Sequence, residues 1–275
     1  MDQLMDRRKP KTEPWKQFQV GIVDQYTNYA FFPAKDINFK TIGSPLYPVV
    51  AQVGVPLNYG LNAGQTAEQQ QKVLDRINAL CFKNAKIDWS SEIGHKLKES
   101  LMLSDLAKRF GIEFELHRLW YTNLPLYSFM LTGISAYAYG EGHRLLIAAM
   151  TKRNVPVWFK VIFCGAWLFF VCSAFLKCRE MLNVSAWVSG VKGALSLGEE
   201  YRNGAVEFYS KEINRNICVR RLLGYKGALR YGVDGEVLWH WYEKPRPKLT
   251  DCLQLVNSYV PEPFYTKEWT RSVLF

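Results

Sequence analysis

The apolar stretch VIFCGAWLFFVCSAFL, residues 161–176, constrains the fold of this chain more than any other feature. It contains no charged residue, while Lys160 precedes it and Lys177 follows it. A core helix of a soluble protein rarely stays apolar on every face over such a length, whereas a helix in lipid does. We therefore predict that the stretch lies in a transmembrane helix, with a buried core helix as the alternative.

Two segments of this chain have the length of a membrane span, because a bilayer core about 30 Å thick needs about 20 helical residues. The first is residues 119–140, which carry no charge, and the second is residues 155–176, interrupted only by Lys160. Lys160 lies near one end of its segment, where its amine can reach the headgroups. The first segment is less hydrophobic than the second, so we expect the two to insert together as a hairpin. Residues 141–154 are the predicted connector.

A ridge of small residues runs along the first predicted span. Thr132, Ala136 and Gly140 repeat at every fourth position and therefore share one face of a helix. Small residues at this spacing let two helices approach closely in lipid. These three residues are candidates for helix–helix packing in the membrane; the alternative is that small residues are simply common there.

The sequence on the N-terminal side of the hairpin favours helices. Thr66 and Gln69 have the spacing of a capping box, and Ser90 or Ser91 is placed to cap the next helix. A third helix is expected to begin at Ser104 and run towards the apolar region. Residues 48–61 hold one candidate strand.

On the C-terminal side, residues 189–224 predict one long helix, or two helices with a joint near Gly204. Arg220 and Gly224 supply the chemistry expected at a helix C-terminus. An Asp-Gly pair predicts a small β-hairpin near residues 229–239, and one short helix is expected in the tail.

These patterns predict a mainly α-helical membrane protein with a two-helix transmembrane hairpin. The expected division is an N-terminal extramembrane region over residues 1–118, the hairpin over residues 119–176, and a helical extramembrane region over residues 177–275. The mean hydropathy of −0.14 is that of a soluble protein, so any membrane-embedded part must be local.

Charge, cysteine and histidine content exclude several function classes. The net charge of +10 is spread along the chain without a basic stripe, so we predict no nucleic-acid partner. The six cysteines form no CxxC pair, which argues against a disulfide framework or a zinc site. No histidine has a carboxylate at metal or triad spacing, and there is no Gly-rich phosphate loop, GxSxG elbow or HExxH helix. We predict no catalytic residue, metal or cofactor.

Two blocks flank the hairpin, residues 87–110 and residues 204–236, and with it they resemble the transmembrane protein 177 family of mitochondrial inner-membrane proteins. The first block carries the resemblance at Asp88, Trp89, Gly94, Leu97, Ser100, Leu101, Leu103, Ser104, Lys108 and Phe110. The second carries it at Gly204, Val206, Glu207, Phe208, Tyr209, Lys211, Asn216, Arg220, Leu222, Leu223, Gly224, Gly227, Tyr231 and Gly235.

The resemblance implies a multi-pass protein of the mitochondrial inner membrane with a non-enzymatic role in cytochrome c oxidase biogenesis. The implied partners are the lipid bilayer, newly made oxidase subunit II and its membrane assembly chaperones, which the protein would protect from degradation. Family members resemble one another in an extra hydrophobic segment near the N-terminus, and residues 1–50 here contain none. The candidates for either partner binding or a structural role are Glu207, Phe208, Tyr209, Lys211, Arg220 and Gly224.

Two other functions compete with this one. The first is a membrane-anchored enzyme with a dispersed active site, which requires a pocket that gathers His95 or His117 with a carboxylate and a nucleophile. The second is a soluble helical interaction protein in which residues 155–176 form the core.

Overall fold

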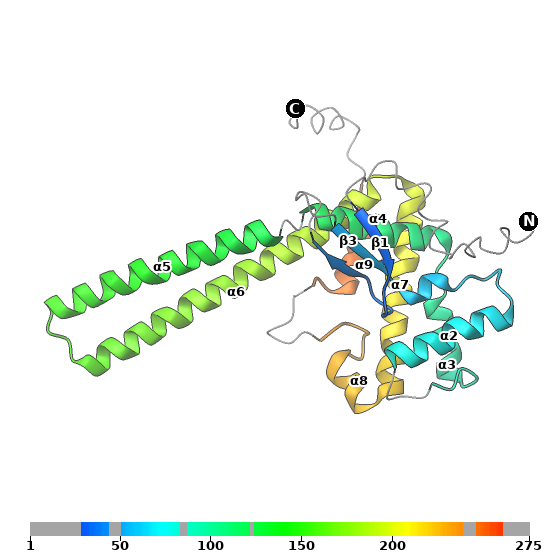
Figure 1. Cartoon of the computed structure of the whole chain (residues 1–275), viewed down its shortest axis with the longest axis horizontal. Coiled ribbons are helices and arrows are strands. Elements are labelled where there is room, and N and C mark those ends of the chain that lie inside the picture. The colour runs from blue at the N-terminus through cyan, green and yellow to red at the C-terminus, as the bar shows by residue number, and fades with distance from the viewer. Residues whose placement is uncertain (1–28, 44–50, 83–86, 122–123, 239–245, 261–275) are drawn as a thin grey trace, which may run out of the picture.

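A long pair of helices projects from a head that is mainly helical (Figure 1). The computed structural model describes residues 29–43, 51–82, 87–121, 124–238 and 246–260. The elements are β1 (Tyr29–Pro33), β2 (Lys40–Ile42), β3 (Ala51–Val55), the 3-10 helix η2 (Leu57–Gly60), α2 (Ala67–Cys81), α3 (Glu92–Leu101), α4 (Asp105–Tyr121), α5 (Leu124–Lys152), α6 (Val157–Leu195), α7 (Glu199–Leu223), α8 (Tyr225–Arg230) and α9 (Leu249–Ser258). We call the projecting α5–α6 pair the arm and the remainder the head.

The head contains a three-stranded sheet in the order β1-β3-β2, with β1 parallel and β2 antiparallel to β3. The central strand β3 confirms the strand predicted within residues 48–61. Val53 of β3 is fully buried and clusters with Ile112 and Leu116 of α4, so the sheet packs on that helix. Strands β1 and β2 have no clear signal in the sequence, because each is short and partly exposed and neither has a clear alternating pattern.

Both predicted N-terminal caps of the head helices are confirmed. The Gln69 backbone N–H donates to Thr66 Oγ1 at 3.4 Å, and the Thr66 N–H donates to Gln69 Oε1 at 3.2 Å. Ser91 caps α3 by accepting from the Gly94 N–H at 3.1 Å. These bonds satisfy N–H groups that the first turn of a helix otherwise leaves unpaired.

The predicted joint near Gly204 is wrong, because α7 runs through this residue without a break. Gly204 is a packing position: a Cβ there would lie 2.5 Å from the Leu106 carbonyl oxygen, so glycine allows α7 to approach the start of α4. The joint lies earlier, at Gly198, whose φ of +137° places it in a region that favours glycine. There α6 ends and α7 begins.

Within the described part of this range, residues 229–238, the predicted β-hairpin is present as a tight turn with one bridge, between Tyr231 and Val237. Gly235 has a φ of +81°, which explains the glycine. The turn presents Glu236, whose carboxylate accepts from the N–H groups of Leu249 at 2.7 Å and Thr250 at 2.8 Å. The turn therefore caps α9, which is the short helix predicted in the tail.

The two helices of the arm are antiparallel, and two contacts fix their register (Figure 1). Gly142 of α5 lies directly against the Trp167 indole of α6, where any Cβ would overlap the ring. Nearer the turn, Lys160 Nζ donates to Thr151 Oγ1 at 3.2 Å. Each contact brings a polar or small residue of α5 against the apolar helix.

The helix boundaries differ from the predicted spans. Leu119 belongs to α4 and is only 4% exposed in the head, and α5 begins at Leu124 and continues through the predicted connector to Lys152. The helix continues because most of the connector is made of good helix formers. The turn forms instead at Asn154, whose φ of +50° suits asparagine, followed by Pro156. The predicted divisions at residues 118 and 176 fall inside α4 and α6.

The apolar stretch of α6 is not a core helix of this chain. Its most apolar window is only 6% buried, and Phe169 is 75% exposed. A soluble protein with residues 155–176 as its core is therefore wrong. Within the described residues, α6 alone has the length and hydropathy of a membrane span, so a second span in α5 stays a prediction.

We predict that Gly142→Leu separates the arm helices, because the Trp167 indole fills the space beside this glycine. Overpacking of this kind typically costs about 1–3 kcal/mol. The matched control is Gly165→Leu on α6, because a Cβ there would meet no atom within 4 Å. Thermal unfolding of the full chain in detergent should show a lower Tm for Gly142→Leu alone. Equal effects of the two substitutions would contradict the Gly142–Trp167 contact.

Candidate functional site

The arm is joined to the head by a continuous helix, because the last turns of α6 enter the head core. Val191 is fully buried, and Trp187 packs against Phe114 of α4 with ring centroids 4.9 Å apart. Gly190 and Gly193 let α4 lie directly against α6, since a Cβ at either position would lie within 3.0 Å of an α4 side chain. The direction of the apolar segment therefore fixes the orientation of the head.

The described cavities do not support a catalytic histidine. Burial lowers the pKa of His117 below its usual value, and its Nε2 is buried without a hydrogen-bond partner in the described part of the chain. Neither His95 nor His117 lines either described cavity. The described residues also contain no cluster of three His, Cys, Asp or Glu side chains arranged to hold a metal ion.

Six residues were singled out above as candidates for partner binding or a structural role, and we call them the family motif. Two of them, Glu207 and Lys211, connect α7 to the segment between α3 and α4. Glu207 accepts from the Ser104 N–H at 2.9 Å and also from the Ser104 hydroxyl. Lys211 Nζ donates to Glu207 at 2.8 Å and to the Met102 carbonyl. Burial raises the pKa of Glu207, but these hydrogen bonds outweigh it and hold the pKa below its usual value.

Phe208 and Tyr209 form part of the head core. Tyr209 is fully buried, and its ring lies 5.8 Å from that of Phe110. Phe208 contacts the same Phe110 ring at 5.7 Å and is partly buried. Edge-to-face pairs of this kind stabilise a core beyond the area they bury.

Arg220 and Gly224 shape the end of α7. Gly224 has a φ of +54°, so the chain turns there from α7 into α8. The Arg220 guanidinium donates to the Ala228 carbonyl at 3.3 Å and to the Tyr231 carbonyl, which ties α8 back onto α7. Each of the six motif residues thus makes a contact or a turn within the fold, which is what a structural role for them predicts. Contact with a partner stays a prediction.

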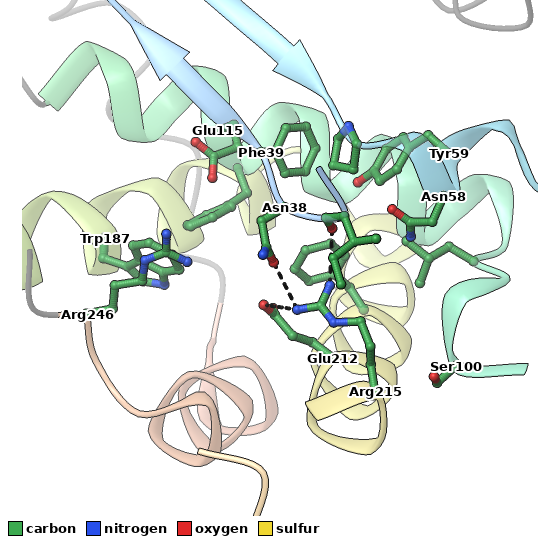
Figure 2. Close-up of a pocket in the computed structure, with 15 residues that line it drawn as sticks. Asn38, Phe39, Asn58, Tyr59, Ser100, Glu115, Trp187, Glu212, Arg215 and Arg246 are labelled. Atoms are coloured by element: carbon green, nitrogen blue, oxygen red, sulfur yellow. Dashed lines mark hydrogen bonds and ion pairs between the residues drawn. The ribbon is translucent and has the colours of Figure 1, made fainter. Parts of the chain in front are cut away.

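A buried polar junction, which the sequence analysis missed, lies where the sheet, α4, α6 and α7 meet (Figure 2). Arg215 of α7 donates to the Ile37 carbonyl at 3.3 Å, to Asn38 Oδ1 at 3.0 Å and to Glu212 at 2.9 Å. The Arg215 side chain is 10% exposed, so its charge needs these partners. The spacing of Glu212 and Arg215 in the sequence could have indicated an ion pair on one face of a helix. The partners of Arg215 near residue 38 could not be predicted, because they are far away in the sequence.

The junction lines a partly open cavity of about 40 Å³. Asn58 Oδ1 and the Tyr59 hydroxyl line it, buried and without a hydrogen-bond partner in the described ranges. Burial, with the nearby carboxylates of Glu115 and Glu212, raises the pKa of Tyr59 well above its usual value. A water needs about 10–15 Å³ of such space, so the cavity suits a few waters rather than an organic substrate.

The predicted ridge Thr132, Ala136 and Gly140 lies on an exposed side of α5. Gly142 packs against Trp167 of α6, whereas a Cβ at Gly140 would meet no atom within 4 Å. The ridge therefore does not make the intramolecular contact of the arm, and its packing against another helix stays a prediction.

A helical head continuous with an exposed apolar helix defines the class: this is a mainly α-helical membrane protein. Its sequence is similar to Transmembrane protein 177 of several vertebrates. The human protein is 26% identical over 217 residues, 78% of this chain and 63% of its own length. The Danio rerio protein is 27% identical over 218 residues, 76% of this chain and 66% of its own length.

The Xenopus laevis protein of the same name is 21% identical over 229 residues, which cover 82% of this chain and 69% of its own length. These similarities confirm the resemblance to the transmembrane protein 177 family indicated by the two sequence blocks. No protein-family model and no solved structure matches the chain.

We predict that Glu207→Gln lowers the free energy of unfolding of the full chain in detergent by about 1 kcal/mol at pH 7, because it weakens charge-assisted hydrogen bonds. A carboxylate with a lowered folded pKa stabilises the fold above its unfolded pKa and loses that effect as the pH falls through the folded value. The difference from the parent should therefore be complete at pH 7, shrink as the pH falls below the usual pKa of a glutamate, and vanish once the pH is below the lowered folded pKa.

The control for this prediction is Glu68→Gln, which removes an exposed pair of the same spacing with Lys72. Such pairs contribute little, so urea unfolding should show almost no change for this control. A pH-independent loss in Glu207→Gln, or an equal loss in the control, would contradict the connecting role of Glu207.

Proposed function

We propose that the protein is a non-enzymatic assembly factor of the mitochondrial inner membrane. In this proposal it stabilises newly made cytochrome c oxidase subunit II and its membrane chaperone. The observation that carries the membrane part is the exposure of the apolar stretch of α6, which water would not tolerate. The oxidase part is supported by the resemblance to the transmembrane protein 177 family.

The charges that bracket the apolar stretch support its placement in lipid. Lys152, Arg153 and Lys160 gather near the turn of the arm, and Trp158 next to them is 62% exposed. Aromatic and basic side chains favour the headgroup layer of a membrane. Lys177 marks the opposite end, where α6 leaves the apolar stretch towards the head.

The head offers an apolar surface for an extramembrane part of a client. Tyr225, Leu229 and Val233, on α8 and the turn after it, are 79%, 51% and 81% exposed. Apolar side chains that are gathered on a surface commonly mark protein contact sites. In the proposed mechanism, client spans pack against the arm in lipid while this α8 surface holds the client outside the bilayer.

We predict that the C-terminally tagged protein, purified from mitochondria in mild detergent, recovers oxidase subunit II and its chaperone by mass spectrometry. The variant Tyr225→Ser/Leu229→Ser/Val233→Ser should reduce this recovery at least about tenfold, because apolar contacts at interface centres dominate binding. Its abundance in the membrane fraction should stay unchanged, since these side chains are exposed.

The matched control is Ile42→Ser/Val260→Ser, which removes exposed apolar side chains from other parts of the head. It should retain full recovery of the client. A preparation of the parent protein that lacks subunit II would overturn the oxidase proposal, and equal losses in both variants would overturn the role of the α8 surface.

A further inference from the structure

The register of the arm places an ion pair at the depth of the middle of the apolar stretch, residues 161–176. Gly142 of α5 lies against Trp167, so the turn of α5 around this glycine is level with the centre of the stretch. Glu141 and Arg144 lie beside Gly142 and form an ion pair at 2.7 Å. With α6 across the bilayer, this pair lies near the bilayer midplane.

Arg144 is the outward-facing member of this pair. An α-helix turns by about 100° per residue, so Arg144 lies nearly opposite Gly142, on the side of α5 that faces away from α6. Glu141 lies about 60° to one side of Arg144 and closer to α6. The Arg144 side chain is accordingly 75% exposed, whereas that of Glu141 is 38% exposed. A helix that approaches this side of α5 therefore meets the cation first.

An exposed guanidinium at this depth needs acceptors from outside the arm. Its N–H donors form a planar fork, and the ion pair joins one terminal nitrogen of Arg144 to one oxygen of Glu141. Hydrocarbon offers no acceptor, and ionisable side chains inside membranes face protein or a water-filled cavity. The headgroup layers are about 15 Å from the midplane, a distance that an arginine side chain does not span.

The side of α5 around Arg144 leaves room for another helix. Four exposed residues follow one another at spacings of four, three and four and so form one continuous seam: Gly133, Tyr137, Gly140 and Arg144. A Cβ at Gly133 or Gly140 would meet no atom within 4 Å, and small residues let helices approach closely in lipid. A helix that packs along this seam brings its facing side chain onto the guanidinium, while Glu141 stays at the edge of the contact.

We propose that this seam binds a transmembrane helix of a partner protein that carries an aspartate or glutamate level with Arg144. Charge complementarity selects this occupant, because the centre of the contact is a cation and a carboxylate there accepts two N–H groups from one edge of the guanidinium. Glu141 keeps its contact at the side.

Other occupants fit the seam less well. A second copy of the chain, paired by a two-fold axis along the membrane normal, would set Arg144 against Arg144. A span without polar side chains would leave the N–H donors of Arg144 buried and unpaired, which is costly in hydrocarbon.

The inference deepens the proposed function, because it gives a chemical character to the client span that packs against the arm. It rests on the membrane part of that function, the placement of α6 in lipid, and not on the identity of the client. The experiment therefore uses model spans that contain no oxidase sequence. Its failure is distinguishable from failure of the oxidase proposal, which the recovery of subunit II reports.

The probes are fluorescent peptides, each a span of about 20 leucine and alanine residues with lysines at both ends. The central residue is glutamate, glutamine, leucine or lysine. The tagged full-length chain is reconstituted with one peptide in phosphatidylcholine vesicles, the vesicles are dissolved in mild detergent, and the peptide retained by the chain is measured. The parent should retain at least about tenfold more of the glutamate peptide than of the others, because only a carboxylate forms a charge-assisted pair with Arg144.

The reversed pair, Glu141→Arg/Arg144→Glu, gives the sharpest outcome, because it keeps both charges but places the carboxylate at the centre of the seam. It should retain at least about tenfold more of the lysine peptide than of the glutamate peptide. The matched control, Lys177→Glu/Glu180→Lys, reverses an exposed ion pair of the same spacing on α6, whose charges are 2.7 Å apart. This control should prefer the glutamate peptide, as the parent does.

The proposal is wrong if the parent chain retains the glutamate peptide no better than the leucine peptide. Equal retention of the glutamate and glutamine peptides would overturn the carboxylate as the partner's group. A reversed pair that keeps the preference of the parent, or an α6 control that loses it, would overturn the role of Arg144. Extraction of the parent from the vesicles by alkaline carbonate, which is measured first, would overturn the membrane placement of α6.

Discussion

The structure depends on one helix that lies in two environments. Residues 161–176 of α6 are apolar and mostly exposed, while its last turns are buried in the head against α4. An apolar helix of this length is stable when lipid covers it, and its attachment to the head is stable because glycines at 190 and 193 allow close contact. The head and the apolar segment therefore behave as one unit joined by continuous helix.

The helix α7, which carries most of the six candidate residues, joins several parts of the head. This helix contacts α4 through Gly204 and Tyr209, the α3–α4 link through Glu207, and the β1–β2 connection through Arg215. Each contact joins segments that are far apart in the sequence. Besides these residues, α8 offers exposed apolar side chains, Tyr225 and Leu229, at the end of α7.

Local chemistry was readable from the sequence where the determining atoms are neighbours in the chain. The caps at Thr66 and Ser91 and the helix end at Gly224 are examples. The predictions were wrong where a contact with a distant segment determines the structure. A glycine at position 204 suggests a break between two helices, but the backbone of Leu106 packs against this glycine and the helix continues. The Arg215 junction depends on the docking of residues near Asn38, which no local pattern indicates.

The central claim is that the apolar stretch of α6 lies in lipid. The native cysteines Cys172, inside the stretch, and Cys178, beyond its end, are both exposed in the fold and provide the test. Spin labels on single-cysteine variants in vesicles should be relaxed by oxygen at Cys172 and by a water-soluble nickel complex at Cys178. Equal access of the nickel complex to both labels would contradict the account.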